Sequence, residues 1–125
     1  MEYLYSELTR KLIGLAVQVH RELGPGLLEN TYKECFAYEL SKSGIQYQLE
    51  VRCPVVYKEV EIDCGYRIDI LVEDKIILEL KSVARLLPVH EAQLLTYLRL
   101  SDKKIGLLIN FNEKLLKNGI KRLIL

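Results

Sequence analysis

Two carboxylates and a lysine are the residues whose types and spacing point most directly to chemistry. Asp69 precedes Glu79 and Lys81 within the segment 66–82. Carboxylate oxygens suit Mg²⁺ or Mn²⁺ better than zinc, and a lysine ammonium binds phosphate as a point charge. The spacing therefore predicts a site that holds a divalent cation beside a phosphate group. The alternative is a solvated charged face on an exposed hairpin.

The segment 66–82 is predicted to form a β-hairpin, because apolar and polar residues alternate in it and alternate strand residues share a face. A register in which paired residue numbers add up to 148 matches every apolar residue with an apolar partner. A slip of one residue would oppose charged and apolar rows. The three-residue turn 73–75 then needs one left-handed residue. The expected pairs are Ile68–Leu80, Ile70–Leu78, Val72–Ile76, Asp69–Glu79 and Arg67–Lys81.

The expected neighbours Asp69 and Glu79 would repel each other. Cross-strand partners lie about 5 Å apart, and two negative charges at such a separation repel by roughly 4 kcal/mol at an effective dielectric constant near 20. Lys81 supplies one compensating charge, and a divalent cation would supply two more. Leu71 and Ile77 belong to the same face, so we expect a half-covered cleft and not an open charged surface.

Composition indicates one soluble domain over residues 1–125, with half of its residues hydrophobic and a net charge of +1. Neither a signal peptide nor a membrane span is expected. The three cysteines have no Cys-x-x-Cys spacing, so free thiols in a reducing cytoplasm are expected. Residues 99–125 contain seven basic and two acidic side chains. This excess suits a polyanion, although a solvated surface would have the same composition.

The order of elements predicts an α/β fold with a mixed sheet. Apolar periodicity and glycine or proline boundaries place helices at 6–22, 28–43 and 89–100. Strands are expected at 45–57, with Pro54 as a bulge or edge, at 59–63 as a continuation or a new strand, twice within 66–82, at 104–111 and at 119–125. The strand–helix–strand unit across 80–105 should bring two strands together in parallel.

Three motifs in this order resemble a known family. Asp69 with Glu79-Leu80-Lys81 is similar to the motif of PD-(D/E)xK nucleases. Gln93-Leu94-Leu95-Thr96-Tyr97 resembles the Gln-x-x-x-Tyr signature of the branch that contains RecB-type exonucleases. The run from Gly26 to Tyr32 resembles the Gly-x-x-Glu-x-x-Tyr signature of the small bacterial and archaeal GxxExxY proteins. The resemblance implies a restriction-endonuclease-like core, a mixed sheet flanked by helices, over nearly the whole chain. Ile68 replaces the proline of the first motif.

The resemblance also implies a set of metal ligands. Asp69 and Glu79 would bind Mg²⁺ or Mn²⁺ through their carboxylates, and Leu80 would add its backbone carbonyl. Glu29 would be a further ligand or would orient water, although an acid in the first turn of a helix is also favoured by the helix dipole.

Three further site residues follow from the same resemblance. Lys81 would orient or help deprotonate the attacking water and stabilise charge on the phosphate. Gln93 and Tyr97 would face the same cleft. Helical spacing independently places them on one face together with His90, opposite an apolar stripe formed by Ala92, Leu95 and Leu98. The alternative for Gln93 and Tyr97 is a helix cap or a satisfied hydrogen bond in the core. His20 and Tyr32 are expected to be packed helix residues, with contact to the cleft as the alternative.

These residues favour a metal-dependent nuclease, endonuclease or exonuclease, acting on nucleic acid and first of all on DNA. A rival hypothesis is a nuclease-fold module that binds nucleic acid or a protein partner with weak or no catalysis. A small-molecule phosphate hydrolase is a third. No membrane partner is expected. A homodimer is considered, with the apolar ends Tyr3, Leu4, Tyr5 and 123–125 as its contact regions.

Overall fold

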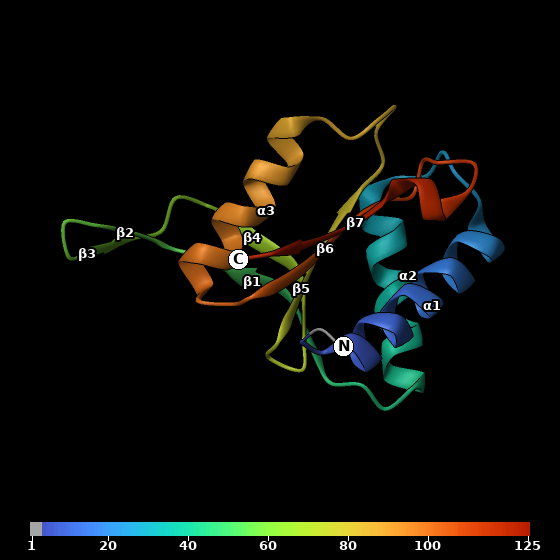
Figure 1. Ribbon diagram of the computed structural model, residues 1–125, viewed down its shortest axis with the longest axis horizontal. Coiled ribbons are helices and arrows are strands. Elements are labelled where there is room, and N and C mark those ends of the chain that lie inside the picture. Colours follow the sequence, from blue (N-terminus) through green and yellow to red (C-terminus); the bar gives the residue numbers. More distant parts are fainter. Residues whose placement is uncertain (1–3) are drawn as a thin grey trace.

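The computed structural model describes residues 4–125. Three helices and seven strands form its regular structure, together with one short 3₁₀ helix (Figure 1). The helices are α1 (Ser6–Leu23), α2 (Glu29–Lys42) and α3 (Pro88–Ser101), and the 3₁₀ helix is η1 (Leu116–Gly119). The strands are β1 (Tyr47–Arg52), β2 (Val55–Tyr57), β3 (Val60–Ile62), β4 (Arg67–Val72), β5 (Ile76–Lys81), β6 (Ile105–Asn110) and β7 (Ile120–Ile124).

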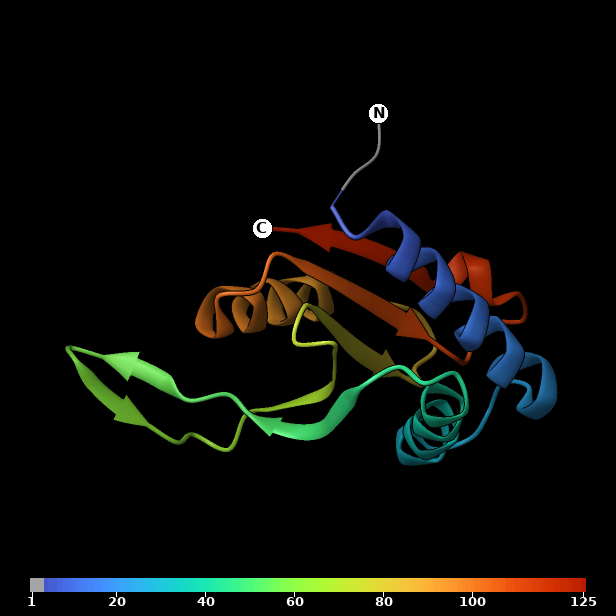
Figure 2. The ribbon, with the colours of Figure 1, turned by 90° about the horizontal axis from the view of Figure 1, so that it is seen from below.

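Five strands form one mixed sheet in the order β1-β4-β5-β6-β7. Only β5 and β6 pair in parallel, and α3 connects them. The helices α1 and α2 lie on one side of this sheet and α3 lies on the other (Figures 1 and 2). The expected α/β fold, a mixed sheet flanked by helices, is therefore confirmed. No helix within residues 4–125 is long and apolar enough to cross a membrane.

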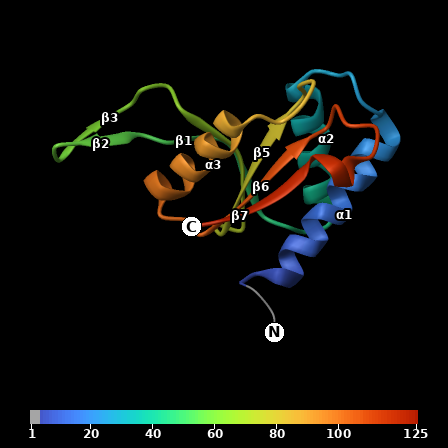
Figure 3. The same ribbon diagram turned by 45° about the horizontal axis from the view of Figure 1, so that its top comes forward.

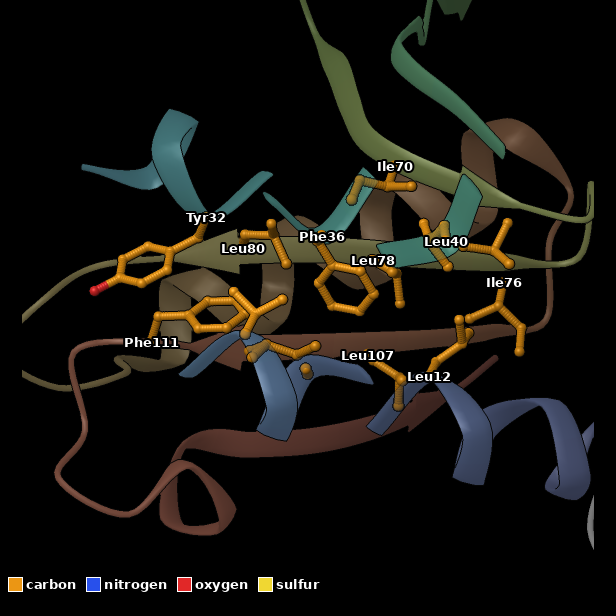
Figure 4. Packing of buried hydrophobic residues seen from close by; sticks show 14 of the residues in the cluster. Leu12, Tyr32, Phe36, Leu40, Ile70, Ile76, Leu78, Leu80, Leu107 and Phe111 are labelled. Carbon is orange, nitrogen blue, oxygen red and sulfur yellow. The ribbon is translucent and has the colours of Figure 1, made fainter. Parts of the chain in front are cut away.

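The larger apolar core lies between the sheet and the pair α1 and α2 (Figure 4). Phe111 follows β6 and stacks on the ring of Tyr32 in α2, with 4.5 Å between ring centroids. A second cluster lies on the α3 side and includes Leu71, Ile77 and Leu94. Leu71 and Ile77 are thus covered by α3, which confirms that the polar face of the hairpin is not an open surface.

The predicted hairpin register is confirmed for three pairs, Ile70–Leu78, Leu71–Ile77 and Val72–Ile76. The backbone ladder ends there, so the expected backbone pairs Asp69–Glu79 and Ile68–Leu80 do not form, but Asp69 and Glu79 remain cross-strand neighbours joined by a hydrogen bond. Ile68 also packs in the α3-side cluster whereas Ile70 packs in the larger core. The strand therefore rotates around Asp69. The turn contains two left-handed residues, Glu73 and Asp74, and not one.

The expected continuous strand over 45–57 is wrong, because it is divided into β1 and β2 at Cys53-Pro54. Proline cannot donate to a strand ladder, so pairing with β4 stops before it. β2 and β3 pair only with each other and form an arm that projects from the body of the protein (Figure 3). Asp63 binds the guanidinium groups of Arg52 and Arg67 at the base of this arm. The ladder between β4 and β5 does not reach the expected pair Arg67–Lys81.

Both ends of the described chain expose some of the apolar residues considered for a dimer. Leu4, Ile124 and Leu125 are exposed, whereas Leu123 packs against the α3-side cluster. Tyr3 lies outside the described residues. The three cysteines are free thiols, as expected.

Candidate functional site

Asp69 and Glu79 meet where the ladder between β4 and β5 ends. The backbone N–H of Asp69 donates to Glu79 Oε1 at 3.3 Å, and the backbone N–H of Leu80 donates to Asp69 Oδ2 at 2.8 Å. Side-chain oxygens thus take the place of the missing backbone partners. Each of the two carboxyl groups therefore accepts a backbone N–H from the opposite strand.

Burial makes ionisation of this carboxyl pair costly. Glu79 is only 3% exposed. Burial, followed by the charge of Asp69, raises the pKa of Glu79 to about 8, although Lys81 acts in the opposite direction. Burial is also the main reason why the pKa of Asp69 is raised, and Glu50 and Glu29 add to it, while the Leu80 N–H opposes it. The pair therefore retains a proton near neutral pH unless a cation compensates its charge.

Lys81 is held next to the pair by α3. Its Nζ donates to Gln93 Oε1 at 3.1 Å and lies 3.8 Å from Glu79 Oε2. Gln93 Nε2 donates in turn to the hydroxyl of Tyr97 at 3.1 Å. Burial raises the pKa of Tyr97 to about 12, so this hydroxyl remains protonated. The structure thus brings Lys81, Gln93 and Tyr97 together in one hydrogen-bonded chain.

Glu29 approaches the site from the start of α2. It lines a pocket of about 150 Å³ together with Asn30, Lys33, Glu50 and Asp69. Glu29 itself is exposed. Its position depends on the preceding loop, so the elements that hold that loop also set the distance between Glu29 and Asp69.

Tyr32 anchors the loop 24–28 that precedes Glu29. Its buried hydroxyl donates to the Gly24 carbonyl at 2.6 Å and accepts the Leu27 N–H at 3.1 Å. Gly26 has a φ of +97°, a conformation that favours glycine. The Gly and Tyr of the Gly-x-x-Glu-x-x-Tyr run therefore position the loop, and its Glu is presented to the pocket. The expectation that Tyr32 is a packed helix residue is confirmed, since it lies in α2 and is fully buried.

Lys33 and Glu50 belong to the same pocket but were not identified from sequence. They form an ion pair in which Lys33 is nearly buried. Glu50 lies between Leu49 and Val51, whose partners Ile70 and Ile68 flank Asp69. It has a left-handed φ of 52°. Lys33 is one helical turn after Glu29, which is a weak local signal. Nothing local marks Glu50, because its place depends on β1 being the strand that pairs with β4.

The predicted face of α3 is only partly right. His90, Gln93 and Tyr97 line one groove, as expected. Ala92 lines it too and is exposed, so its assignment to the packed stripe is wrong; the buried residues of α3 are Leu94, Tyr97 and Leu98. His90 Nδ1 accepts the Leu87 N–H at the start of the helix. His20 lies elsewhere, with Nε2 2.7 Å from the Glu113 carbonyl.

The donors at the carboxyl pair fit a hard divalent cation. Within residues 4–125 no group of three or more His, Cys, Asp or Glu side chains is placed to hold a metal ion. Mg²⁺ does not need such a cage, since it is commonly bound by one or two carboxylates together with waters and substrate phosphate. Asp69 and Glu79 supply two carboxylates. Leu80 turns its N–H toward Asp69, and in an extended strand its carbonyl points to the same side.

Comparison with known proteins identified one family. The family model described as the PD-(D/E)XK nuclease superfamily matches residues 6–123. No curated protein and no solved structure gave a significant match. Nucleases of this superfamily generally use divalent metal ions, which agrees with the oxygen donors at Asp69 and Glu79. The family match spans almost the entire chain and omits only the last residue of β7 from the helices and strands described above, so the protein belongs to the PD-(D/E)XK nuclease superfamily.

Proposed function

We propose that the protein hydrolyses phosphodiester bonds of nucleic acid with Mg²⁺ or Mn²⁺ held by Asp69 and Glu79. The observation that supports this most is the juxtaposition of the buried Glu79 carboxyl and the half-buried Asp69 carboxyl, each of which accepts a backbone N–H from the opposite strand, with Lys81 3.8 Å from Glu79. A buried pair of like charges is unfavourable for folding unless a ligand compensates it. The two carboxylates would bind a divalent cation, and the ammonium of Lys81 would bind a phosphate attached to that cation.

Each residue of the site has a distinct proposed role. Asp69 and Glu79 bind the ion, with the Leu80 carbonyl as a further ligand. Bound Mg²⁺ or Mn²⁺ supplies Lewis acidity toward the phosphate and lowers the pKa of a coordinated water. Glu29 stands at the entrance of the pocket, exposed and close enough to raise the pKa of Asp69, and so it orients water or adds a ligand.

Lys81 would act on the phosphate and on the attacking water. Gln93 accepts one of its hydrogen bonds and so fixes the direction of a long, flexible side chain. Tyr97 holds the Gln93 amide from its other end. Such preorganised charge is effective because it needs no rearrangement when negative charge develops on the phosphate.

We further propose that the chain belongs to the GxxExxY proteins within the RecB-like branch of the superfamily. The loop function of Gly26 and Tyr32 and the hydrogen bonds of Gln93 and Tyr97 support this assignment. DNA is the proposed substrate.

A cleavage assay tests the proposal. Supercoiled plasmid, linear duplex, single-stranded DNA and RNA are incubated with Mg²⁺, Mn²⁺ or EDTA. We expect cleavage only with metal, abolished by Asp69→Asn and retained by Asp74→Asn, which alters an exposed carboxylate in the turn of the same hairpin. Lys81→Met should retain metal binding and reduce cleavage by orders of magnitude, with the exposed Lys104→Met as its control. Equal cleavage by Lys81→Met and the parent would show that the activity arises elsewhere.

If the parent cleaves none of these substrates but binds one of them, the rival hypothesis of a nuclease-fold binding module is supported. A homodimer also stays a proposal. Light scattering at micromolar concentration tests it, and a monomer near 14.5 kDa would contradict it.

A further inference from the structure

A groove of about 350 Å³ runs along the outer side of α3. Its walls come from the first turns of this helix and from Tyr66, which precedes β4 at the base of the arm. The lining residues are Tyr66, Val89, His90, Ala92, Gln93, Thr96 and Tyr97. The groove is open to solvent, because Tyr66 is 43% exposed and Val89 is 64% exposed.

The groove adjoins the proposed phosphate site through two shared residues. Gln93 and Tyr97 line the groove, and Gln93 accepts the hydrogen bond of Lys81. A strand whose phosphate lies at Lys81 would therefore bring its adjoining nucleoside to the mouth of the groove. Tyr66 is fixed there by an edge contact with Tyr97, with ring centroids 6.1 Å apart.

The chemistry of the lining suits a nucleobase and not a phosphate. Among the described residues that line the groove there is no Lys, Arg, Asp or Glu. The groove offers no cationic side chain to bind a phosphate, but it offers an aromatic ring and aliphatic surface on which a base can stack. Every base has a flat π-face, so such stacking tolerates any sequence.

We propose that this groove is a subsite for one unpaired nucleobase of the substrate strand, with Tyr66 as the ring on which the base stacks. The inference rests on the proposed function, since the phosphate at Lys81 aligns the strand. In a duplex each base is already stacked between its neighbours and must be extruded to reach a side groove, at a cost of a few kcal/mol. The groove therefore selects single-stranded nucleic acid, or an unpaired end, over an intact duplex.

Binding of two probes with identical phosphates tests this subsite. One is a short fluorescent oligothymidine, and the other is an abasic oligomer of the same length. Affinities are measured by fluorescence anisotropy in Ca²⁺, with a gel to verify that the probes stay intact. The parent should bind oligothymidine at least about 5-fold more tightly, the lower end of measured base–aromatic stacking. Tyr66→Leu should abolish this preference and leave abasic binding unchanged, whereas Tyr66→Phe should keep it.

Two further variants separate the subsite from general effects. Ala92→Leu at an exposed helix position fills the groove and should also abolish the preference. Tyr38→Leu removes an exposed ring on α2 and should preserve it. The subsite is refuted if the parent binds both probes equally, if it binds neither, or if Tyr66→Leu weakens both equally.

Failure of the subsite is distinguishable from failure of the proposed function. Tyr66 is not among the proposed metal ligands, so Tyr66→Leu should show the same Mn²⁺-induced rise in melting temperature as the parent. A missing base preference together with a normal Mn²⁺ response and metal-dependent cleavage overturns only the subsite. A missing Mn²⁺ response and absent cleavage in the parent overturn the proposed function, whatever the probes show.

Discussion

Replacement of Glu79 by glutamine should make the metal-free protein less sensitive to pH. Glutamine has nearly the same shape and keeps an oxygen that can accept the Asp69 N–H, but it has no charge to desolvate. The pKa of Glu79 is raised from 4.5 to about 8 in the folded protein. At about 1.4 kcal/mol per pKa unit, this upward shift lowers the unfolding free energy of the parent by roughly 5 kcal/mol once Glu79 is ionised.

The sign of the effect follows from proton counting. Below pH 4.5 Glu79 is protonated in both states and contributes no pH dependence. Between pH 4.5 and about 8 the unfolded chain loses this proton while the folded protein keeps it, so the stability of the parent falls as pH rises. Above about pH 8 Glu79 is ionised in both states, and it causes no further fall in stability. The stability of Glu79→Gln relative to the parent should therefore increase across this window and then level off.

Urea unfolding in EDTA, at intervals from pH 4.5 to 8.5, measures the difference. All other ionisable groups are common to both proteins, so subtraction isolates the titration of Glu79 together with its effect on Asp69. Asp74→Asn, which removes a solvated carboxylate from the same hairpin, should give a curve nearly parallel to that of the parent. If the Glu79→Gln curve is also parallel to the parent curve, Glu79 ionises normally and the strained carboxyl pair does not exist.

Three further outcomes are expected. Millimolar Mn²⁺ should raise the melting temperature of the parent by mass action and should have no effect on Asp69→Asn; an equal rise in both would remove the proposed metal site. Tyr32→Phe should destabilise the protein by about 1 to 3 kcal/mol in urea unfolding, because the loop 24–28 loses buried hydrogen bonds; an unchanged midpoint would show that the hydroxyl does not anchor it. Gly106→Ala should cost about 1 to 3 kcal/mol by overpacking, since the new Cβ would lie 2.8 Å from Leu94 Cδ1, and equal stability would mean that the fully buried Leu94 moves freely.

Helices, strands and the core of the hairpin register were predictable because they follow from local periodicity. The alternation in 66–82 is sufficient to align Ile70 with Leu78 and Val72 with Ile76. Boundaries at proline and glycine likewise locate α2 and α3, since these residues act on the backbone where they stand. Prediction failed at the division of the strand 45–57, where Pro54 was expected to mark a bulge or an edge and instead separates β1 from β2.

The candidate site depends partly on local sequence pattern and partly on tertiary packing. Sequence alone identified Asp69, Glu79 and Lys81 as a group, because a hairpin brings near neighbours in sequence close together. It did not show that the ladder stops at Ile70, since this depends on burial of Ile68 under α3. Where the ladder stops, the carboxylates of Asp69 and Glu79 accept backbone N–H groups in its place.

Residue types, faces and short-range pairings were determined by the sequence through its apolar period and its turn residues. The distance from Gln93 to Lys81, the presence of Glu50 in one pocket with Asp69 and the groove beside Tyr66 were decided only by tertiary structure. Each depends on which strand lies next to which and on where a helix crosses the sheet. These relations are set by packing among elements distant in sequence, for which no local pattern exists.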